Sequence, residues 1–274
     1  MWHKGALVFL HLLATSEFAI HKTQNKILTM EDSNPNIKEE KLNYQIDGTE
    51  YFNYVYYDDS NDEKRPGIIV IDEWWGLTDY GKRRARALVN LGYISMVVDM
   101  YGNGKTVEDP QSAGKLASVF YKDPSLAKKQ IDVAIEHLKK YAQTEHSKIG
   151  AIGYCFGGFV VLNAAKLGSD LTGVVSFHGG LSGAKPDKNR MKAKVLVCHG
   201  ADDPFENPNV ENFKSEMDEA GADYRFIVYP GATHAFSNPK ATAKGEKYNM
   251  PIKYNEEADE RSWNEMKQFF EKLF

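Results

Sequence analysis

A single cysteine lies between glycines in the stretch GYCFGG, residues 153–158. The pattern G-x-C-x-G is typical of a nucleophile elbow, a strained turn between a strand and a helix that exposes a nucleophilic side chain. Gly153 and Gly157 stand at the two positions where side chains would collide in so tight a turn. Cys155 therefore predicts covalent catalysis by a thiolate. The alternative, a buried cysteine in a glycine-rich turn, is disfavoured by the apolar run before it and the helical run after it.

A thiol nucleophile of this kind needs a base and an acid that orients the base. The stretch VLVCHGADDPF places Asp203 three residues after Gly200, and RFIVYPGATHAF carries His234 in the loop after the next apolar run. The order nucleophile, acid, histidine is that of α/β-hydrolases, so His234 is predicted to be the base. Asp202 is the alternative acid, but the G-x-x-D spacing selects Asp203, and Asp202 is then a turn or capping residue.

Alternating apolar and amphipathic stretches predict the elements that position these side chains. Strands are expected at residues 65–76, 93–102, 148–155, 171–180, 193–203 and 223–236, and helices at residues 79–93, 125–142, 157–168, 209–221 and 256–274. This alternation predicts an α/β protein with a mostly parallel, doubly wound sheet and helices on both faces. With the order of nucleophile, acid and histidine, the chain resembles proteins of the α/β-hydrolase fold. An antiparallel strand is expected at residues 49–59, whereas the polar, turn-rich residues 31–48 are expected to precede the sheet.

The composition points to small-molecule chemistry. The chain has 42% hydrophobic and 26% charged residues and a net charge of -4, so no basic surface for nucleic acid or an anionic membrane is expected. Cys198 lies in an apolar run and is interpreted as a buried hydrophobic residue. No C-x-x-C pair or His and Cys cluster at metal spacing occurs, so no disulfide, metal or cofactor is expected. The protein is expected to be a monomer or a small homo-oligomer.

The first 29 residues allow two interpretations. They have a short basic start and an apolar run, Ala6 to Ala14, about as long as the apolar part of a signal peptide and too short to span a bilayer. His11 interrupts the run and no clean small-x-small cleavage site follows it, so the stretch is alternatively an extension before Met30. A cytoplasmic location is favoured, with a secreted or periplasmic one if a leader is cleaved. Residues 30–274 are predicted to form a single domain.

With these motifs the chain resembles the dienelactone hydrolase family of α/β-hydrolases. The stretches IIVIDEWWGL, VVDMYG, GYCFGG, HGADDPF and GATHAF match the blocks of that family in order. The resemblance implies a catalytic triad of Cys155, Asp203 and His234, and hydrolysis of small carboxylic esters or lactones of the carboxymethylenebutenolidase type. It also implies a fourth catalytic residue, Glu73, which in relatives contacts the nucleophile in the resting enzyme and moves when substrate enters.

A glutamate beside the nucleophile has a chemical rationale. A cysteine next to a histidine tends to form a thiolate–imidazolium pair, and an exposed thiolate is open to oxidation. Glu73 is expected to hold the thiol protonated until substrate displaces it; the alternative, a solvated strand-end carboxylate, fits poorly with a fully apolar strand. Arg83 and Arg84 are interpreted as a solvated helix face, with support of the Glu73 loop as the alternative.

The backbone N–H groups of Phe156 and Trp74, each directly after a catalytic residue, are expected to form the oxyanion hole. Trp74 and Trp75 are expected to wall the pocket, and Tyr101 to contact substrate or Glu73. Packing alone is the alternative for these aromatic residues.

The chain departs from the family where the substrate carboxylate is bound. The founding enzymes hold it with two arginines, whose positions are occupied here by Asn103 and Asn238. Asparagine can hydrogen-bond an oxygen but cannot supply a bidentate cation, so these residues are expected to contact substrate while the carboxylate preference is in doubt. Lys240 is either a substitute or a solvated lysine.

The predicted reaction is attack of Cys155 on an activated ester or lactone, followed by hydrolysis of the acyl-enzyme. A thiolate is also a good leaving group, which suits esters and lactones better than amides. A cysteine thioesterase or acyl transferase would use the same triad. A non-catalytic binding protein would need one triad position degenerate, and none is.

Overall fold

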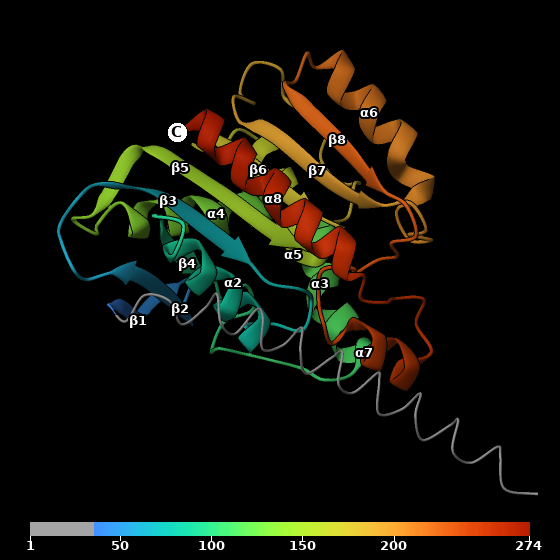
Figure 1. The fold of residues 1–274 in the computed structure, drawn as a ribbon, viewed down its shortest axis with the longest axis horizontal. Coiled ribbons are helices and arrows are strands. Elements are labelled where there is room, and N and C mark those ends of the chain that lie inside the picture. Colours follow the sequence, from blue (N-terminus) through green and yellow to red (C-terminus); the bar gives the residue numbers. More distant parts are fainter. Residues whose placement is uncertain (1–35) are drawn as a thin grey trace, which may run out of the picture. The chain divides into compact units, whose positions relative to one another are not determined.

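The computed structural model describes residues 36–274, which form one eight-stranded sheet (Figure 1). Its strands in chain order are β1 (Ile37–Ile46), β2 (Thr49–Asp58), β3 (Arg65–Ile71), β4 (Ile94–Val97), β5 (Thr144–Tyr154), β6 (Gly173–Phe177), β7 (Lys194–Gly200) and β8 (Tyr224–Tyr229). They lie in the spatial order β1-β2-β4-β3-β5-β6-β7-β8. β1 and β2 are antiparallel to their neighbours. The six strands from β3 to β8 are parallel to one another.

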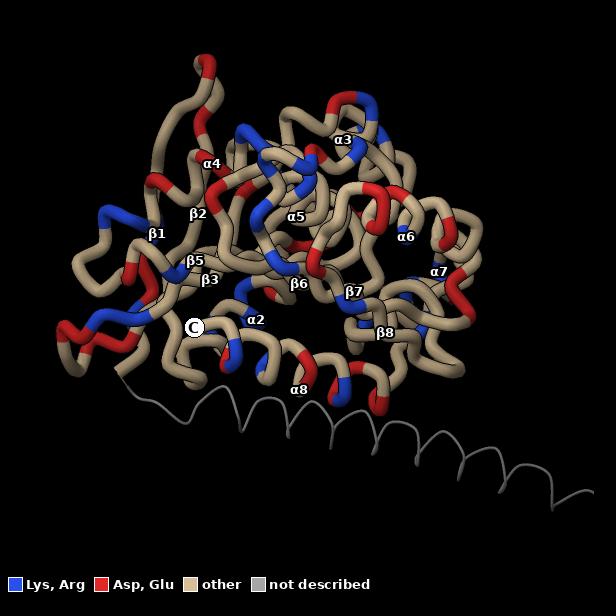
Figure 2. Tube along the Cα trace, turned by 90° about the horizontal axis from the view of Figure 1, so that it is seen from above, with Lys and Arg blue, Asp and Glu red and all other residues tan. Residues whose placement is uncertain are grey.

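Helices cover both faces of this sheet. They are α2 (Asp79–Val89), α3 (Pro110–Lys122), α4 (Ser125–Leu138), α5 (Phe156–Lys166), α6 (Val210–Glu219), α7 (Ala241–Tyr248) and α8 (Glu256–Leu273), with a short 3₁₀ turn at Asn207–Asn209. Figure 2 shows α2 and α8 on one side of the strands and α3, α4 and α5 on the other. This arrangement confirms the expected mostly parallel, doubly wound fold with helices on both faces.

The sheet has one hydrophobic core on each face, because successive side chains of a buried strand point to opposite faces. In β3, Ile69 and Ile71 pack under α4 and α5, while Ile68 and Val70 face α2. Strands buried on both sides must be apolar at every position, because successive side chains point to opposite faces. The continuous apolar runs in the sequence are therefore the signature of a sheet with helices on both faces.

The carboxyl ends of the parallel strands meet at one edge of the sheet. Residues 72–76 follow β3, the turn at Cys155 follows β5, and the loops with Asp203 and His234 follow β7 and β8. In open α/β sheets this edge is where ligands bind. The fold thus brings together side chains that lie far apart in the sequence.

Three elements differ from the sequence-based expectations. Residues 37–46 form the edge strand β1, so the expectation that residues 31–48 precede the sheet is wrong for this part. Alternate residues of β1 from Glu40 to Ile46 are half-buried, and the polar residues between them are exposed, as is usual for an edge strand. Helices α3 and α7 were not predicted from the sequence, although Asp109 and Pro110 form a typical helix start for α3.

The interpretations of residues 1–29 as a leader or an extension lie outside the described residues. The division into such a segment and a single domain at residues 30–274 stays a prediction. Within residues 36–274, no helix is long and apolar enough to cross a membrane.

Candidate active site

Cys155 lies in the turn between the last residue of β5 and the first residue of α5. Its φ of 52° and ψ of -113° are unusual for a residue other than glycine and cost on the order of 1–3 kcal/mol. The chain passes very close to itself here. A Cβ atom on Gly153 would lie 2.0 Å from the carbonyl oxygen of Gly157, and one on Gly157 would lie 2.2 Å from that of Ile71. Only glycine fits at either position, as the elbow pattern predicts.

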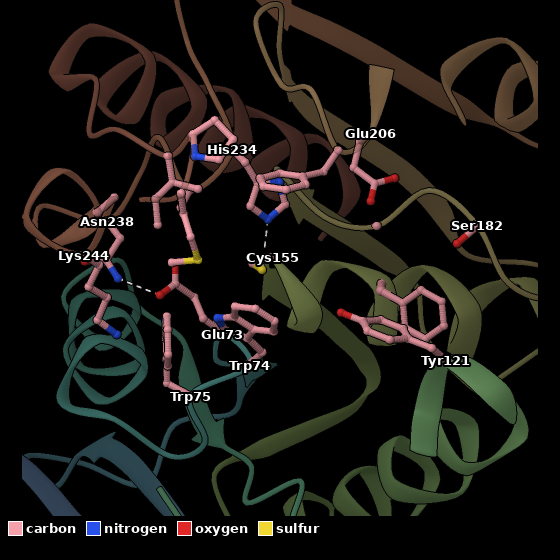
Figure 3. A pocket seen from close by; sticks show the side chains of 18 of the residues that line it. Glu73, Trp74, Trp75, Tyr121, Cys155, Ser182, Glu206, His234, Asn238 and Lys244 are labelled. Atoms are coloured by element: carbon pink, nitrogen blue, oxygen red, sulfur yellow. Dashed lines mark hydrogen bonds between the residues drawn. The ribbon is translucent and has the colours of Figure 1, made fainter. Parts of the chain in front are cut away.

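The imidazole of His234 bridges the thiol and a carboxylate, and Figure 3 shows its contact with Cys155. Its Nε2 lies 3.0 Å from Cys155 Sγ, and its Nδ1 lies 2.8 Å from Asp203 Oδ2. Asp203 is fully buried and its Oδ1 accepts hydrogen bonds from two backbone N–H groups of the following turn. Asp202, the alternative acid, is exposed. The three side chains named by the sequence motifs therefore form one continuous chain of contacts, which contains Asp203 and not Asp202.

The side chains of Cys155 and Asp203 favour the protonated form of His234. Burial alone would lower the pKa of His234, but the neighbouring Cys155 and the hydrogen bond to Asp203 outweigh it and raise the pKa well above its ordinary value. Burial raises the pKa of the Asp203 carboxyl, and the contact with His234 outweighs this and lowers it. His234 is therefore able to hold a proton released by the thiol.

Glu73 lies at the end of β3 and is only 4% exposed. Asn238 donates a hydrogen bond of 2.7 Å to Glu73 Oε2, whereas Glu73 Oε1 is buried without a hydrogen-bond partner among the described residues. The resemblance implied a resting contact between Glu73 and Cys155. In this structure the thiol is bonded to His234 and the carboxylate to Asn238, although both side chains line the same cavity.

Glu73 is also an unusually basic carboxylate. Burial raises the pKa of its carboxyl group to about 7, and the adjacent Asp72 contributes to the rise. The ammonium of Lys244 and the hydrogen bond from Asn238 act in the opposite direction. The group therefore changes its charge near neutral pH.

Lys244 is a site residue that the sequence analysis missed. It lies on α7, lines the cavity beside Glu73, and its Nζ lies 3.7 Å from the ring centroid of Trp75. Lys240, the residue named from the sequence, is exposed and lines only an adjoining cavity of about 580 Å³. The spacing of Lys240, Lys244 and Lys247 is helical, which was the available signal, but no helix was expected between residues 237 and 250.

These side chains open into a cavity of about 520 Å³ with mostly aromatic and aliphatic walls. Trp74 and Trp75 form part of the wall, in an edge-to-face contact at 5.2 Å between ring centroids. At the other end the cavity is lined by Tyr121, Ser182 and Glu206 (Figure 3). A volume of this size suits a small organic molecule. Within residues 36–274, no group of three His, Cys, Asp or Glu side chains is arranged to hold a metal ion.

The two expected oxyanion-hole donors are available for an acceptor. The backbone N–H groups of Trp74 and Phe156 donate to no acceptor within residues 36–274. Phe156 is the first residue of α5, where the helix dipole favours negative charge. Tyr101 does not line the cavity. Its hydroxyl donates to the carbonyl oxygen of Trp74 at 3.0 Å and so positions the Trp74–Trp75 peptide.

Two other residues lie elsewhere than expected. Asn103 is exposed in a turn with a φ of 56°, and its N–H donates to Glu50 on β2, so the structure does not bring it to the cavity. Arg84 is not on a solvated face: it pairs with Asp259 and donates to the carbonyl oxygen of Ser237, in the loop after His234.

Cys198 is fully buried, and burial raises the pKa of its thiol to about 12. His178, at the end of β6, was not singled out from the sequence. It contacts the backbone N–H of Cys155, and its place at the end of a predicted strand was the signal that could have found it.

The model of the dienelactone hydrolase family matches residues 53–274. Among curated proteins, a putative carboxymethylenebutenolidase of Saccharolobus solfataricus is 24% identical over 271 residues, covering 86% of this chain and 99% of that protein. A solved structure of a dienelactone hydrolase-like promiscuous phosphotriesterase from metagenomic libraries is 32% identical, with a TM-score of 0.81, and covers 87% of this chain and 99% of that one. Another, m3DLH, is 30% identical with a TM-score of 0.82 and the same coverage.

Proposed function

The chain belongs to the dienelactone hydrolase family, and from this membership we propose that it hydrolyses small carboxylic esters or lactones through an acyl-enzyme on Cys155. His234 serves as the base and Asp203 orients its imidazole. The observation that carries the proposal is the continuous contact from Sγ through the imidazole to the buried carboxylate, at 3.0 and 2.8 Å. Nucleophile, base and orienting acid in hydrogen-bond contact are the general requirement for covalent catalysis of acyl transfer.

In the first half of the reaction, Cys155 Sγ attacks the carbonyl carbon and its proton moves to His234 Nε2. The electron pair of the C=O bond moves to the oxygen, which accepts hydrogen bonds from the N–H groups of Trp74 and Phe156. The tetrahedral intermediate then collapses, the C–O bond to the leaving alkoxide breaks, and His234 returns the proton to that oxygen.

In the second half, His234 removes a proton from water, and the hydroxide attacks the thioester carbon. The C–S bond breaks and the thiolate is restored. Amides are poor substrates for this arrangement because the thiolate leaves the tetrahedral intermediate more readily than an amine does. We therefore expect no peptide cleavage.

A substrate panel with intact-mass detection of the protein tests the proposal. It contains an aryl ester, a neutral lactone, a carboxylate-bearing dienelactone, an aryl thioester and an aryl dialkyl phosphate, the last because one similar structure is that of a promiscuous phosphotriesterase. We expect the highest kcat/KM for esters or lactones and an acyl adduct on the Cys155 peptide. A higher value for the thioester would favour the thioesterase alternative, and rapid turnover without any adduct would contradict the mechanism.

Lys244 provides a way to bind an anionic substrate without the two family arginines. Among the described residues that line the catalytic cavity, Lys244 is the one lysine or arginine. Its ammonium group makes no hydrogen bond to another side chain of the described residues. The name carboxymethylenebutenolidase, borne by a relative, specifies a lactone with a carboxylate. We propose that Lys244 binds such a group.

Replacing Lys244 by methionine is expected to lower kcat/KM for a carboxylate-bearing lactone by roughly 10- to 100-fold, the usual worth of a charge-assisted hydrogen bond. The value for a neutral aryl ester should change less than about twofold. Lys240→Met is the matched control, because that side chain is exposed and lies outside the catalytic cavity. Equal losses on both substrates, or a larger effect of Lys240→Met, would contradict this role.

Glu73 is proposed to restrain the thiol in the resting enzyme, because its buried Oε1 lacks a hydrogen donor. A buried acceptor without a partner is costly, and a thiol rotated away from His234 would supply one. Glu73→Gln should therefore still form the acyl-enzyme on a good substrate. It should, however, alter the rate and pH dependence of Cys155 alkylation by iodoacetamide. Superimposable alkylation profiles from pH 5 to 9 would show that Glu73 does not act on the nucleophile.

The same substitution is expected to stabilise the protein at alkaline pH. The pKa of Glu73 is raised from 4.5 to about 7 on folding, so between these values the folded state retains a proton that the unfolded chain has lost. The free energy of unfolding therefore falls as the pH rises through this window, by roughly 3 kcal/mol. Glutamine does not titrate, so Glu73→Gln should unfold at higher urea than wild type at pH 8, with a smaller difference at pH 5. The control is Glu246→Gln on the exposed side of α7, which should show no such difference.

A further inference from the structure

A second histidine lies directly behind the nucleophile. His178 is fully buried at the end of β6, with a φ of 41°, a conformation that few residues other than glycine adopt. Its Nδ1 lies 3.1 Å from the backbone nitrogen of Cys155, whose N–H it shares with the carbonyl oxygen of Phe177 at 3.0 Å. Its ring packs edge to face against that of His234, at 5.5 Å between centroids. None of the chemical steps described above uses this side chain.

The contacts of His178 determine its protonation state. The backbone N–H of Cys155 can only donate, so Nδ1 must carry the lone pair and the ring proton must lie on Nε2. Nε2 lies 2.7 Å from Ser237 Oγ and donates to it. An imidazolium would direct a second N–H group at the N–H of Cys155. The geometry therefore requires the neutral tautomer with its proton on Nε2.

The hydrogen bonds continue from Ser237 to α2. Ser237 Oγ accepts from His178, so its own proton is directed to the hydroxyl oxygen of Tyr80 at 2.8 Å. The Tyr80 hydroxyl in turn donates to the carbonyl oxygen of Ser237 at 3.2 Å. Ser237 lies three residues after His234. His178 consequently connects the amide of the nucleophile to the loop that carries the base.

The surrounding charges oppose protonation of His178. Burial lowers the pKa of the His178 imidazole well below the ordinary value, and the neighbouring His234, Arg84 and His199 side chains lower it further. Arg84 itself is paired with the carboxylate of Asp259. The bond that Nδ1 accepts from Cys155 is therefore maintained across the range in which most hydrolases work.

We propose that neutral His178 is a positioning residue that holds the amide of Cys155 and the loop of His234 in register, and so fixes the separation of Sγ and Nε2. This inference rests on the proposed function, because it assigns His178 a role toward the nucleophile and base named there. His178 touches no reacting atom. Its effect is transmitted through the backbone of the elbow on one side and through Ser237 on the other.

Three substitutions separate the two ends of this connection. His178→Asn keeps an acceptor near the position of Nδ1 and tolerates the positive φ, but it is too short to reach Ser237. His178→Gln keeps a donor for Ser237 and loses the acceptor for Cys155. Ser237→Ala removes only a hydroxyl group and leaves His178 and its backbone unchanged, so it remains informative where a His178 variant folds poorly. His146→Gln, at an exposed histidine of β5, is the control.

Each of the three variants is expected to lower kcat for an aryl ester roughly tenfold with KM within about twofold, and to raise the midpoint pH of Cys155 alkylation by about one unit. The double variant His178→Asn/Ser237→Ala should lose no more than His178→Asn, because both break the same connection. Nitrogen-15 NMR of the wild type should show one unprotonated and one protonated ring nitrogen for His178 from pH 5 to 8. A purely structural role would lower the denaturation midpoint and leave the alkylation profile of the folded protein unchanged.

The proposal is overturned if folded His178→Gln and Ser237→Ala retain the wild-type kcat and alkylation profile, or if the His178 ring titrates to an imidazolium near pH 6. These outcomes are distinct from failure of the proposed function. Ester hydrolysis that persists in Cys155→Ala would refute the function itself, whatever the His178 variants do.

Discussion

Cys155→Ala is expected to abolish hydrolysis of an aryl ester, with a loss on the order of 10⁵-fold in kcat, because removal of the nucleophile eliminates the covalent pathway. The fold should persist, because replacing the thiol by a methyl group removes no contact on which the elbow depends. The close backbone approaches in the elbow are made by Gly153 and Gly157. The measurement is ester turnover together with intact mass, which should show no acyl adduct on the variant.

Cys155→Ser should retain only a trace of activity. A hydroxyl is far less acidic than a thiol, so His234 must remove its proton during the attack instead of before it. Cys198→Ala is the control, because Cys198 is buried within β7 with a raised thiol pKa. Greater loss of turnover in Cys198→Ala than in Cys155→Ala would overturn the assignment of the nucleophile.

Asp203→Asn is expected to lower kcat by roughly 10²- to 10⁴-fold, whereas Asp202→Asn should change it less than about twofold. Asp203 accepts the hydrogen bond from His234 Nδ1 at 2.8 Å, and an amide favours the wrong tautomer of the imidazole. Asp202 is exposed and provides a matched carboxylate one residue away. Turnover numbers for the two variants, with His234→Ala as the reference for complete loss of the base, decide between them.

The same pair has a pH signature. Asp203 contributes to the raised pKa of His234, so Asp203→Asn should move the protonation of the imidazole to lower pH. The fraction of thiolate–imidazolium pair at pH 6 to 7 then decreases, and Cys155 alkylation in this range should slow. Asp202→Asn should reproduce the wild-type profile. Equal effects of the two substitutions would leave the acid unassigned.

Local sequence signals were sufficient for the six parallel strands and for the residues proposed as nucleophile, base and acid. The buried strands are covered by helices on both faces, so they must be apolar throughout. This apolar pattern can be recognised in the sequence without knowing which elements pack against each strand. The elbow has a similarly local cause, since Gly153 and Gly157 are required by backbone contacts within a few residues or with the adjacent strand. Asp203 and His234 are recognisable because each stands in the loop directly after an apolar strand, and such loops meet at one edge of the sheet.

The sequence alone failed where the cause is not local. β1 has a polar sequence because one face of an edge strand meets solvent. Lys244 reaches Glu73 only because α7 packs beside the cavity, and no periodic pattern specifies which neighbour a short helix will have. Asn103 has the position of a family arginine in the sequence, but its backbone N–H donates to Glu50 on β2 and its side chain does not line the cavity.

His178 shows the distinction most directly. Its place at a strand end was visible in the sequence, but its neutral tautomer follows from a donor on Cys155 and an acceptor on Ser237, which come from two different loops. The sequence by itself determined the residue types, the order of the six parallel strands and the strained elbow, because these depend on backbone sterics and on the burial of successive side chains. Only the tertiary structure decided which polar groups meet, since hydrogen-bond partners and pKa values depend on distances between segments that the chain brings together by folding.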